Sequence, residues 1–282
     1  MRHQPLTDAQ RRCFNEEGYL IVRNALDPET VARLVEAGDR LVASARLKDR
    51  QRSKCGHFDG FRNAIAMDDA FLPLLTQPTT VPLVVQLFGP NLQLMTSHLI
   101  YRHPDPSDAP PTHRHPGWHR DIAGTPEDLG HPHIPRMEVK VAYYLTDLSE
   151  PGCGATLVAP GSHKLKERLV ISDGQVDPVG ALEPSLRPGD ALFFENRTWH
   201  AGGANRCGRT RKAVMFGYGY RWLRPMDYLV QDSDLLEKIA DPIGRQLLGA
   251  TGDPEGRFVA GGGAEPLRDW CREHAVAWRP VA

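Results

Sequence analysis

The sequence predicts a mainly β domain that begins with helices. Four runs rich in β-branched and aromatic residues lie between residues 92 and 222, whereas the first ninety residues show helical spacing of apolar side chains. No linker-like segment divides the chain, and its 282 residues are within the length that β-sandwiches and barrels reach as one domain. We therefore expect a single domain over residues 1–282, with an N-terminal helical part (about 5–90), a β core (about 91–225) and a helical and loop tail (about 226–282).

The N-terminal part contains clear helix-start signals. Residues 7–10 have the form of a capping box, and Gly18 follows as a plausible helix end. Asp27 and Pro28 form a second start, with an N-cap followed by proline at the first helical position. Residues 68–88 are expected to form a further helix, and these helices are expected to brace the β core.

The β core is predicted from runs that combine strand-forming composition with turn signals at their ends. The strand-like runs are residues 92–101, 137–146, 190–200 and 211–222. Residues 102–136 are rich in proline, histidine, aspartate and glycine, which is typical of a long functional loop. The tail is expected to be helical up to Leu248 and glycine-rich beyond it.

A metal site is indicated by His119 and Asp121, which lie in the long loop. Side chains two apart on an extended segment point to the same side, so both can reach one ion while Arg120 points away. His200, at the end of the third strand-like run, supplies a third ligand. Two imidazoles and a carboxylate are the facial triad that binds non-haem Fe(II) and leaves positions open for substrate and dioxygen.

Arg211 is the candidate partner for a cosubstrate carboxylate. If the runs 190–200 and 211–222 pair as a hairpin, Arg211 begins the return strand near His200. A ferrous ion with open positions commonly takes a 2-oxo acid, whose far carboxylate then needs a cation. Arginine matches a carboxylate with two parallel hydrogen bonds and stays charged.

These residues resemble the phytanoyl-CoA dioxygenase-like branch of the iron(II)- and 2-oxoglutarate-dependent oxygenases. The resemblance spans roughly residues 5 to 225 and rests on several motifs together. They are His119-Arg-Asp121, His200 with Gly202-Gly203 and Asn205, Arg211, the segments 144–152 and 155–164, Pro188-Gly189-Asp190, and the N-terminal pattern between residues 6 and 28.

The resemblance implies a double-stranded β-helix (a jelly-roll, cupin-like core) with flanking α-helices. It implies Fe(II) as cofactor, held by His119, Asp121 and His200, with 2-oxoglutarate and dioxygen as cosubstrates. Arg211 would bind the far carboxylate of 2-oxoglutarate, and Thr156 would offer it a hydroxyl. The expected reaction is oxidation, most simply hydroxylation, of a small organic molecule such as a lipid-derived acid or a secondary metabolite, with decarboxylation of 2-oxoglutarate to succinate.

The sequence departs from the family pattern at two positions, and at a third position it keeps the metal-binding carboxylate. Many relatives carry a hydroxyl residue where this chain has Gly202 or Ala213, so part of the hydrogen bonding to 2-oxoglutarate must come from elsewhere. Related halogenases replace the metal carboxylate by a small residue so that halide can bind, whereas Asp121 is retained here. Halogenation is therefore disfavoured, and substrate identity does not follow from the fold.

Rival interpretations remain open on the sequence alone. The chain could be a non-catalytic or differently metallated jelly-roll binding protein with a vestigial site, or a protein or nucleic-acid demethylase, which neutral charge does not support. Other histidines near the proposed pair could form a different site, but a solvated loop is the simpler interpretation; they are His103, His113, His115, His131 and His133. His163 is expected to be structural.

Composition and charge narrow the partners. The formal charge of −1 comes from 34 basic and 35 acidic side chains, so no overall field attracts nucleic acid or an anionic membrane. No apolar stretch approaches the ~20 residues of a membrane span, and the N-terminus lacks the apolar region of a signal peptide. The five scattered cysteines contain no Cys-x-x-Cys pair. We expect a cytoplasmic protein with a small-molecule substrate; the sequence leaves its oligomeric state open.

Overall fold

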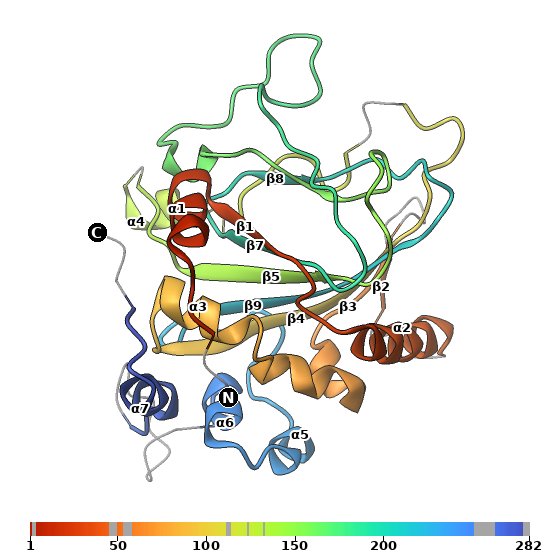
Figure 1. The fold of residues 1–282 in the computed structure, drawn as a ribbon. Helices are drawn as coiled ribbons and strands as arrows, with labels where there is room; N and C mark the ends of the chain where they lie inside the picture. Colours follow the sequence, from red (N-terminus) through yellow and green to blue (C-terminus); the bar gives the residue numbers. More distant parts are fainter. Residues whose placement is uncertain are drawn as a thin grey trace.

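Two antiparallel sheets form the core of the computed structural model, which describes residues 1, 4–44, 50–52, 58–110, 114–122, 124–131, 133–250 and 263–278. The larger sheet contains, in spatial order, β1 (Tyr19–Val22), β7 (Ala191–Glu195), β5 (Glu138–Tyr144), β9 (Arg211–Tyr220), β4 (Leu92–Arg102), β3 (Phe58–Phe61) and β2 (Arg50–Arg52). The smaller sheet pairs β6 (Thr156–Val158) with β8 (His200–Gly202). Figure 1 shows β8 on one side of the larger sheet and most helices on the other.

From β5 to β9 the chain passes back and forth between the two sheets. β5, β7 and β9 belong to the larger sheet, and β6 and β8, which lie between them in sequence, belong to the smaller one. Isolated bridges extend the smaller sheet, because His119 pairs with His200 and Val158 pairs with Leu182. This alternation is the jelly-roll arrangement that the sequence led us to expect.

The predicted helix starts at the N-terminus are confirmed. Helix α1 (Asp8–Glu17) begins with the capping box of Thr7 and ends at Gly18, whose φ of 79° is left-handed. Helix α2 (Pro28–Ala43) begins at Asp27, whose side chain accepts a hydrogen bond from the Thr30 N–H. Both helices follow from local sequence, because side-chain caps satisfy N–H groups that the helix itself leaves unpaired.

The prediction of one helix over residues 68–88 is wrong. The structure divides this segment into the 3₁₀-helix η3 (Asp69–Thr76) and helix α3 (Val81–Phe88); a short 3₁₀ turn, η2 (Ala64–Ala66), precedes them. The break falls at Gln77, whose ψ is 117°. The next residue is Pro78, and a proline pushes the residue before it out of the α region. A second proline, Pro82, fits the first turn of α3.

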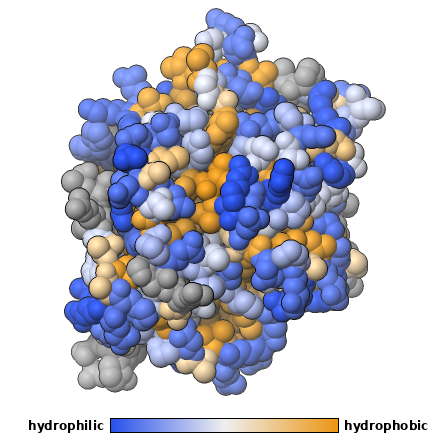
Figure 2. Space-filling model, in the orientation of Figure 1, coloured by the Kyte–Doolittle hydropathy of each residue, from blue (hydrophilic) through white to orange (hydrophobic). Residues whose placement is uncertain are grey.

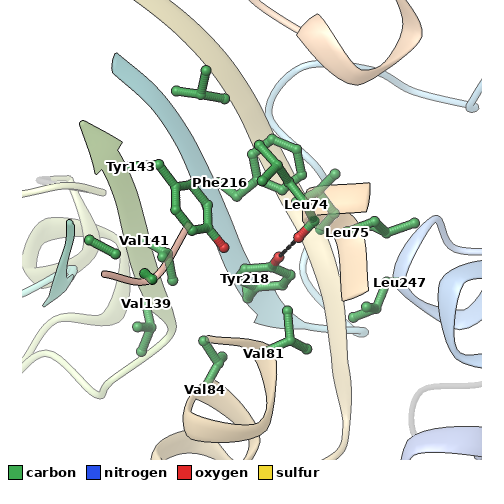
Figure 3. Close-up of a cluster of buried hydrophobic side chains, with 14 of the residues drawn as sticks. Leu74, Leu75, Val81, Val84, Val139, Val141, Tyr143, Phe216, Tyr218 and Leu247 are labelled. Carbon is green, nitrogen blue, oxygen red and sulfur yellow. Dashed lines mark hydrogen bonds between the residues drawn. The ribbon is translucent and has the colours of Figure 1, made fainter. Parts of the chain in front are cut away.

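The two faces of β5 have different surroundings. Val139, Val141 and Tyr143 face the helices and join the larger hydrophobic core. Figure 3 shows these three side chains together with Tyr218, whose hydroxyl donates to the Leu74 carbonyl oxygen at 3.3 Å. The alternate residues of β5 point between the two sheets, since successive side chains of a strand alternate. The larger sheet thus separates a packed core from the interior of the jelly-roll.

The third strand-like run does not form one strand, and the hairpin with residues 211–222 that we considered does not form. β7 ends at Glu195, a turn follows, and β8 begins at His200 in the other sheet. The turn is stabilised by Asn196, whose side-chain oxygen accepts from the Met137 N–H at 2.9 Å. β5 lies between β7 and β9, so the return strand pairs with β5 and β4 instead of β7.

The tail is helical up to Leu248, as expected, and it contains a further helix after that residue. It contains α5 (Ser233–Lys238), α6 (Pro242–Leu247) and α7 (Pro266–Glu273). Helix α7 was not predicted; the glycine-rich residues 251–262 lie outside the described residues.

Hydrophilic side chains cover much of the face shown in Figure 2, with hydrophobic ones between them. No described helix is by itself long and apolar enough to cross a membrane, although η3 and α3, bent by 43°, reach that length and composition together.

Candidate metal centre and cosubstrate pocket

His119, Asp121 and His200 lie together at one point inside the jelly-roll. One potential ligand atom from each residue lies within 4.8 Å of the others. The backbone fixes the two histidines, because each N–H donates to the other's carbonyl oxygen at 3.0 Å. Arg120, between the two loop ligands, points away and its guanidinium lies 5.2 Å from the centre of the Trp199 ring. The structure therefore brings the three predicted ligands together.

Both imidazoles are oriented for metal binding. The Nδ1 atom of His119 lies 2.7 Å from the Gly117 carbonyl oxygen, and that of His200 lies 2.9 Å from the Thr198 carbonyl oxygen. A carbonyl oxygen only accepts, so each Nδ1 carries the proton and each Nε2 offers a lone pair. Burial lowers the pKa of His200 to about 4, so this ligand is neutral at physiological pH.

Asp121 presents two chemically different oxygens. Its Oδ1 lies 3.1 Å from the Lys140 ammonium. Its Oδ2 lies 3.8 Å from the His200 Nε2 and is buried without a hydrogen-bond partner among the described residues. Burial by itself raises the pKa of Asp121, but Lys140 and the two histidines outweigh it and hold the pKa at about 2. The carboxylate is therefore ionised.

The donor set fits a ferrous ion. A buried carboxylate oxygen without a partner costs free energy unless a cation or donor meets it, and two Nε2 lone pairs converge on the same place. Two imidazoles and one carboxylate suit non-haem Fe(II) with open positions. Among the described residues, no other group of histidine, cysteine and acidic side chains could hold a metal ion.

Arg211 lies in the same cavity, at the start of β9. The residue is 6% exposed, and its Nη1 donates to the Thr156 Oγ1 at 3.4 Å. The Tyr144 hydroxyl also donates to Thr156, at 2.8 Å. Burial lowers the pKa of Arg211, but an arginine remains charged at neutral pH. No acidic side chain of the described chain forms an ion pair with it, so this buried cation lacks the anion that burial demands.

The two departures from the family pattern have structural reasons. A Cβ atom at Gly202 would lie 2.0 Å from the His115 carbonyl oxygen, so the backbone of the metal-binding loop occupies the space of a side chain. Ala213 is the cross-strand partner of Tyr144. The hydroxyls of Tyr144 and Thr156 therefore stand beside Arg211 in place of hydroxyls at positions 202 and 213.

Replacing Gly202 by alanine is expected to displace the metal-binding loop. The added methyl group would overlap the His115 carbonyl, which is backbone and cannot move aside like a side chain. We expect weaker Fe(II) binding, measured by titration under anaerobic conditions, together with a lower melting temperature. Gly208→Ala provides the comparison for a glycine with open space around it, although its φ of 72° adds local strain. Unchanged metal affinity in Gly202→Ala would contradict this close approach.

The cavity has a volume of about 260 Å³ and is lined by both polar and apolar side chains. Two of the lining residues, Lys140 and His98, were not singled out from the sequence. Tyr144, which contacts the lining residue Thr156, entered the sequence analysis only as part of the segment 144–152. A sequence signal for Lys140 and Glu138 was present, because they alternate with valines in the strand-like run 137–146. Charged residues in a central strand predict a polar site on that face. The other lining side chains are Phe58, Arg62, Ile100, His115, Pro116, Thr156, Ala201, Gly202 and Met215, beside the triad and Arg211.

The remaining histidines have other surroundings. His103 contacts the buried Asp59 at 2.7 Å, and His131 and His133 stack on each other with ring centres 5.5 Å apart. The Nε2 of His163 lies 3.0 Å from the Asn15 carbonyl oxygen, which agrees with the structural role expected for it. His115 lines the cavity but is outside the metal-ligand cluster. His113 lies outside the described residues.

Comparison with known proteins gives consistent results. Residues 14–213 match the family Phytanoyl-CoA dioxygenase (PhyH). A probable phytanoyl-CoA dioxygenase of Caenorhabditis elegans is 26% identical over 244 residues, covering 76% of this chain and 75% of that protein.

Solved structures share the fold at low identity. The epimerase SnoN from nogalamycin biosynthesis has a TM-score of 0.60 and 23% identity, covering 76% of this chain and 80% of that one. HygX from Streptomyces hygroscopicus, solved with nickel and 2-oxoglutarate bound, has a TM-score of 0.63 and 17% identity, covering 82% and 94%. With the triad in place and the match spanning most of the sequence, the chain belongs to the phytanoyl-CoA dioxygenase family of iron- and 2-oxoglutarate-dependent oxygenases.

Proposed function

We propose that this protein uses Fe(II), 2-oxoglutarate and dioxygen to oxidise a small organic molecule, most simply by hydroxylation, and releases succinate. The observation that carries the proposal is one cavity that contains both the triad and a buried arginine, Arg211, which has no anionic partner among the described residues. A metal centre and a carboxylate clamp in one cavity suit a 2-oxo acid that binds both.

Each residue would have a defined task. His119, Asp121 and His200 would hold the iron, which supplies activation of dioxygen for the oxidation. Arg211 would bind the far carboxylate of 2-oxoglutarate, and the Thr156 hydroxyl beside it would donate a further hydrogen bond. Because the site is walled by protein, these contacts would act in a medium of low dielectric constant, where they are stronger than in water.

The cavity favours a small substrate with polar groups. Arg62, which follows β3, and Lys140 of β5 line it together with Arg211. Arg62 is paired with Asp227 and Lys140 with Asp121, so the wall of the cavity is polar. The large aromatic side chains of β9 do not line it, since Tyr218 lies in the helix-side core and Tyr220 stacks on Phe88. A small acid or another polar metabolite therefore suits this space better than a long apolar chain.

Hydroxylation is the simplest outcome, but the fold serves others. SnoN, which shares the fold, is described as an epimerase, so substrate placement as well as the metal ligands decides the product. Retention of Asp121 still argues against halogenation, because halide would need the position that this carboxylate fills. The rival proposal, a vestigial binding protein, is disfavoured by two features that occur together: three ligands with free donor atoms, and a buried Arg211 without an anionic partner in the described part of the chain.

The proposal is tested by cosubstrate consumption. Purified protein reconstituted anaerobically with Fe(II) is expected to form succinate when 2-oxoglutarate and dioxygen are added, slowly without substrate and faster with an accepted one. Omission of iron gives the background rate. Tight binding of Fe(II) and 2-oxoglutarate without any succinate formation, across a panel of small polar acids and amines, would favour the binding-protein alternative.

A further inference from the structure

Lys140 is the charged side chain closest to the metal carboxylate. It lies in the middle of β5, between Val139 and Val141, and its side chain is only 9% exposed. Its ammonium is 3.1 Å from the Asp121 Oδ1 and 3.9 Å from the Glu138 Oε2. Placing an ammonium in a protein interior is costly, and these two carboxylates offset the cost.

Because of this ion pair, the two carboxylate oxygens of Asp121 have different surroundings. Oδ1 is held by Lys140, while Oδ2 faces the His200 Nε2 and has no hydrogen-bond partner among the described residues. A carboxylate can bind a metal through one oxygen or through both. If both oxygens of Asp121 bound, the second would take a position that the facial triad otherwise leaves open.

We propose that Lys140 is a positioning residue that restricts Asp121 to one-oxygen coordination and so keeps the metal positions for 2-oxoglutarate and dioxygen open. The ion pair with the Lys140 ammonium would occupy Oδ1 and leave Oδ2, which has no hydrogen-bond partner among the described residues, as the oxygen that binds the ion. This inference rests on the proposed function, because it assigns Lys140 a task at the same metal site.

Glu138 holds Lys140 in place from behind. It is fully buried and, among the described residues, its two oxygens have no hydrogen-bond partner. Burial raises the pKa of Glu138 to about 7, and the Lys140 ammonium at 3.9 Å offsets that rise only in part. Gly217 makes room for it, because a Cβ there would lie 2.2 Å from the Glu138 Oε1. Gly217 is the cross-strand partner of Lys140. The glycine, the glutamate and the lysine therefore form one unit behind the metal site.

The test uses Co(II) as a spectroscopic substitute for iron. In Lys140→Met, the visible absorption of bound Co(II) is expected to change before 2-oxoglutarate is added, because a second carboxylate oxygen alters the coordination. Co(II) is expected to bind at least as tightly as in the wild type, whereas the Kd for 2-oxoglutarate rises about tenfold, the size of other effects from groups behind metal ligands.

The opposite directions of these two affinities identify the mechanism. A variant that is merely damaged would bind both Co(II) and 2-oxoglutarate more weakly. Because Lys140→Met leaves Glu138 without its ion pair, the double variant Glu138→Gln/Lys140→Met is measured in parallel. It is expected to give the same pattern, and Glu138→Gln alone, which keeps the ammonium, is expected to retain the wild-type spectrum.

Two results would overturn the proposal. One is an unchanged Kd for 2-oxoglutarate in both lysine variants. The other is an unchanged Co(II) spectrum together with weaker 2-oxoglutarate binding, which would mean that Lys140 contacts the cosubstrate directly. Failure of the proposed function would be recognised separately in the wild-type protein, which would then either bind neither Co(II) nor 2-oxoglutarate, or bind Fe(II) and 2-oxoglutarate without forming succinate.

Discussion

Replacing Asp121 by alanine is expected to abolish 2-oxoglutarate turnover and to weaken Fe(II) binding by more than about a hundredfold, the upper size of effects seen when only groups behind metal ligands are changed. The substitution removes the anionic ligand and leaves two neutral imidazoles. It also leaves Lys140 without one of its two carboxylates, so the cavity becomes more positive and repels the cation further. The measurements are anaerobic Fe(II) titration and succinate formation.

A matched control distinguishes the loss of a metal-binding carboxylate from the loss of any carboxylate. Asp173 is exposed, and its replacement by alanine is expected to leave both measurements unchanged. Circular dichroism of Asp121→Ala shows whether the fold survives. If a folded Asp121→Ala protein binds Fe(II) as well as the wild type and turns over 2-oxoglutarate at the same rate, the triad is not the metal site.

Replacing Arg211 by alanine is expected to raise the KM for 2-oxoglutarate strongly. The variant would leave the cosubstrate carboxylate in a buried place with only the hydroxyls of Thr156 and Tyr144. Breaking a buried ion pair by removing one partner costs about 3 kcal/mol or more, which corresponds to a rise of about a hundredfold. Fe(II) affinity in the absence of 2-oxoglutarate is expected to stay near the wild-type value, because Arg211 is not a ligand.

The comparison with lysine and with an exposed arginine sharpens this test. Arg211→Lys keeps the charge but loses the planar pair of donors, so an intermediate KM is expected. Arg187, which is exposed, serves as the surface control. An unchanged KM in Arg211→Ala would mean that another cation, such as Arg62 in the same cavity, holds the carboxylate.

Local sequence predicted the parts of the fold that depend on neighbouring residues. The capping box at Thr7 and the N-cap at Asp27 define helix starts through hydrogen bonds within one turn, and both formed where expected. The division of residues 68–88 also has a local cause, since Pro78 ends the first helix. We predicted one helix because the apolar residues on both sides of Pro78 have helical spacing. Helix α7 lies beyond the glycine-rich segment and was missed.

Strand pairing was the main error. Residues 190–200 and 211–222 have the composition of a hairpin, yet β5 lies between them because it pairs with both β7 and β9. Pairing depends on which distant strands compete for the same edge, and no local pattern records that competition. Arg211 lies in the metal cavity because β9 pairs with β4 and β5, and not because it forms a hairpin with the run that ends at His200.

The sequence by itself identified the candidate ligands of the site, which are two histidines and an aspartate, and the arginine beside them. It also showed the strand alternation that directs side chains to one face. Only the tertiary structure decided which groups meet them. Lys140 contacts Asp121, and Tyr144 stands across from Ala213, because β5 came to lie beside β9 and beneath the metal-binding loop. The physical reason is that ligand identity is a property of single residues, whereas the contacts of a buried charge are set by the register of strands far apart in the chain.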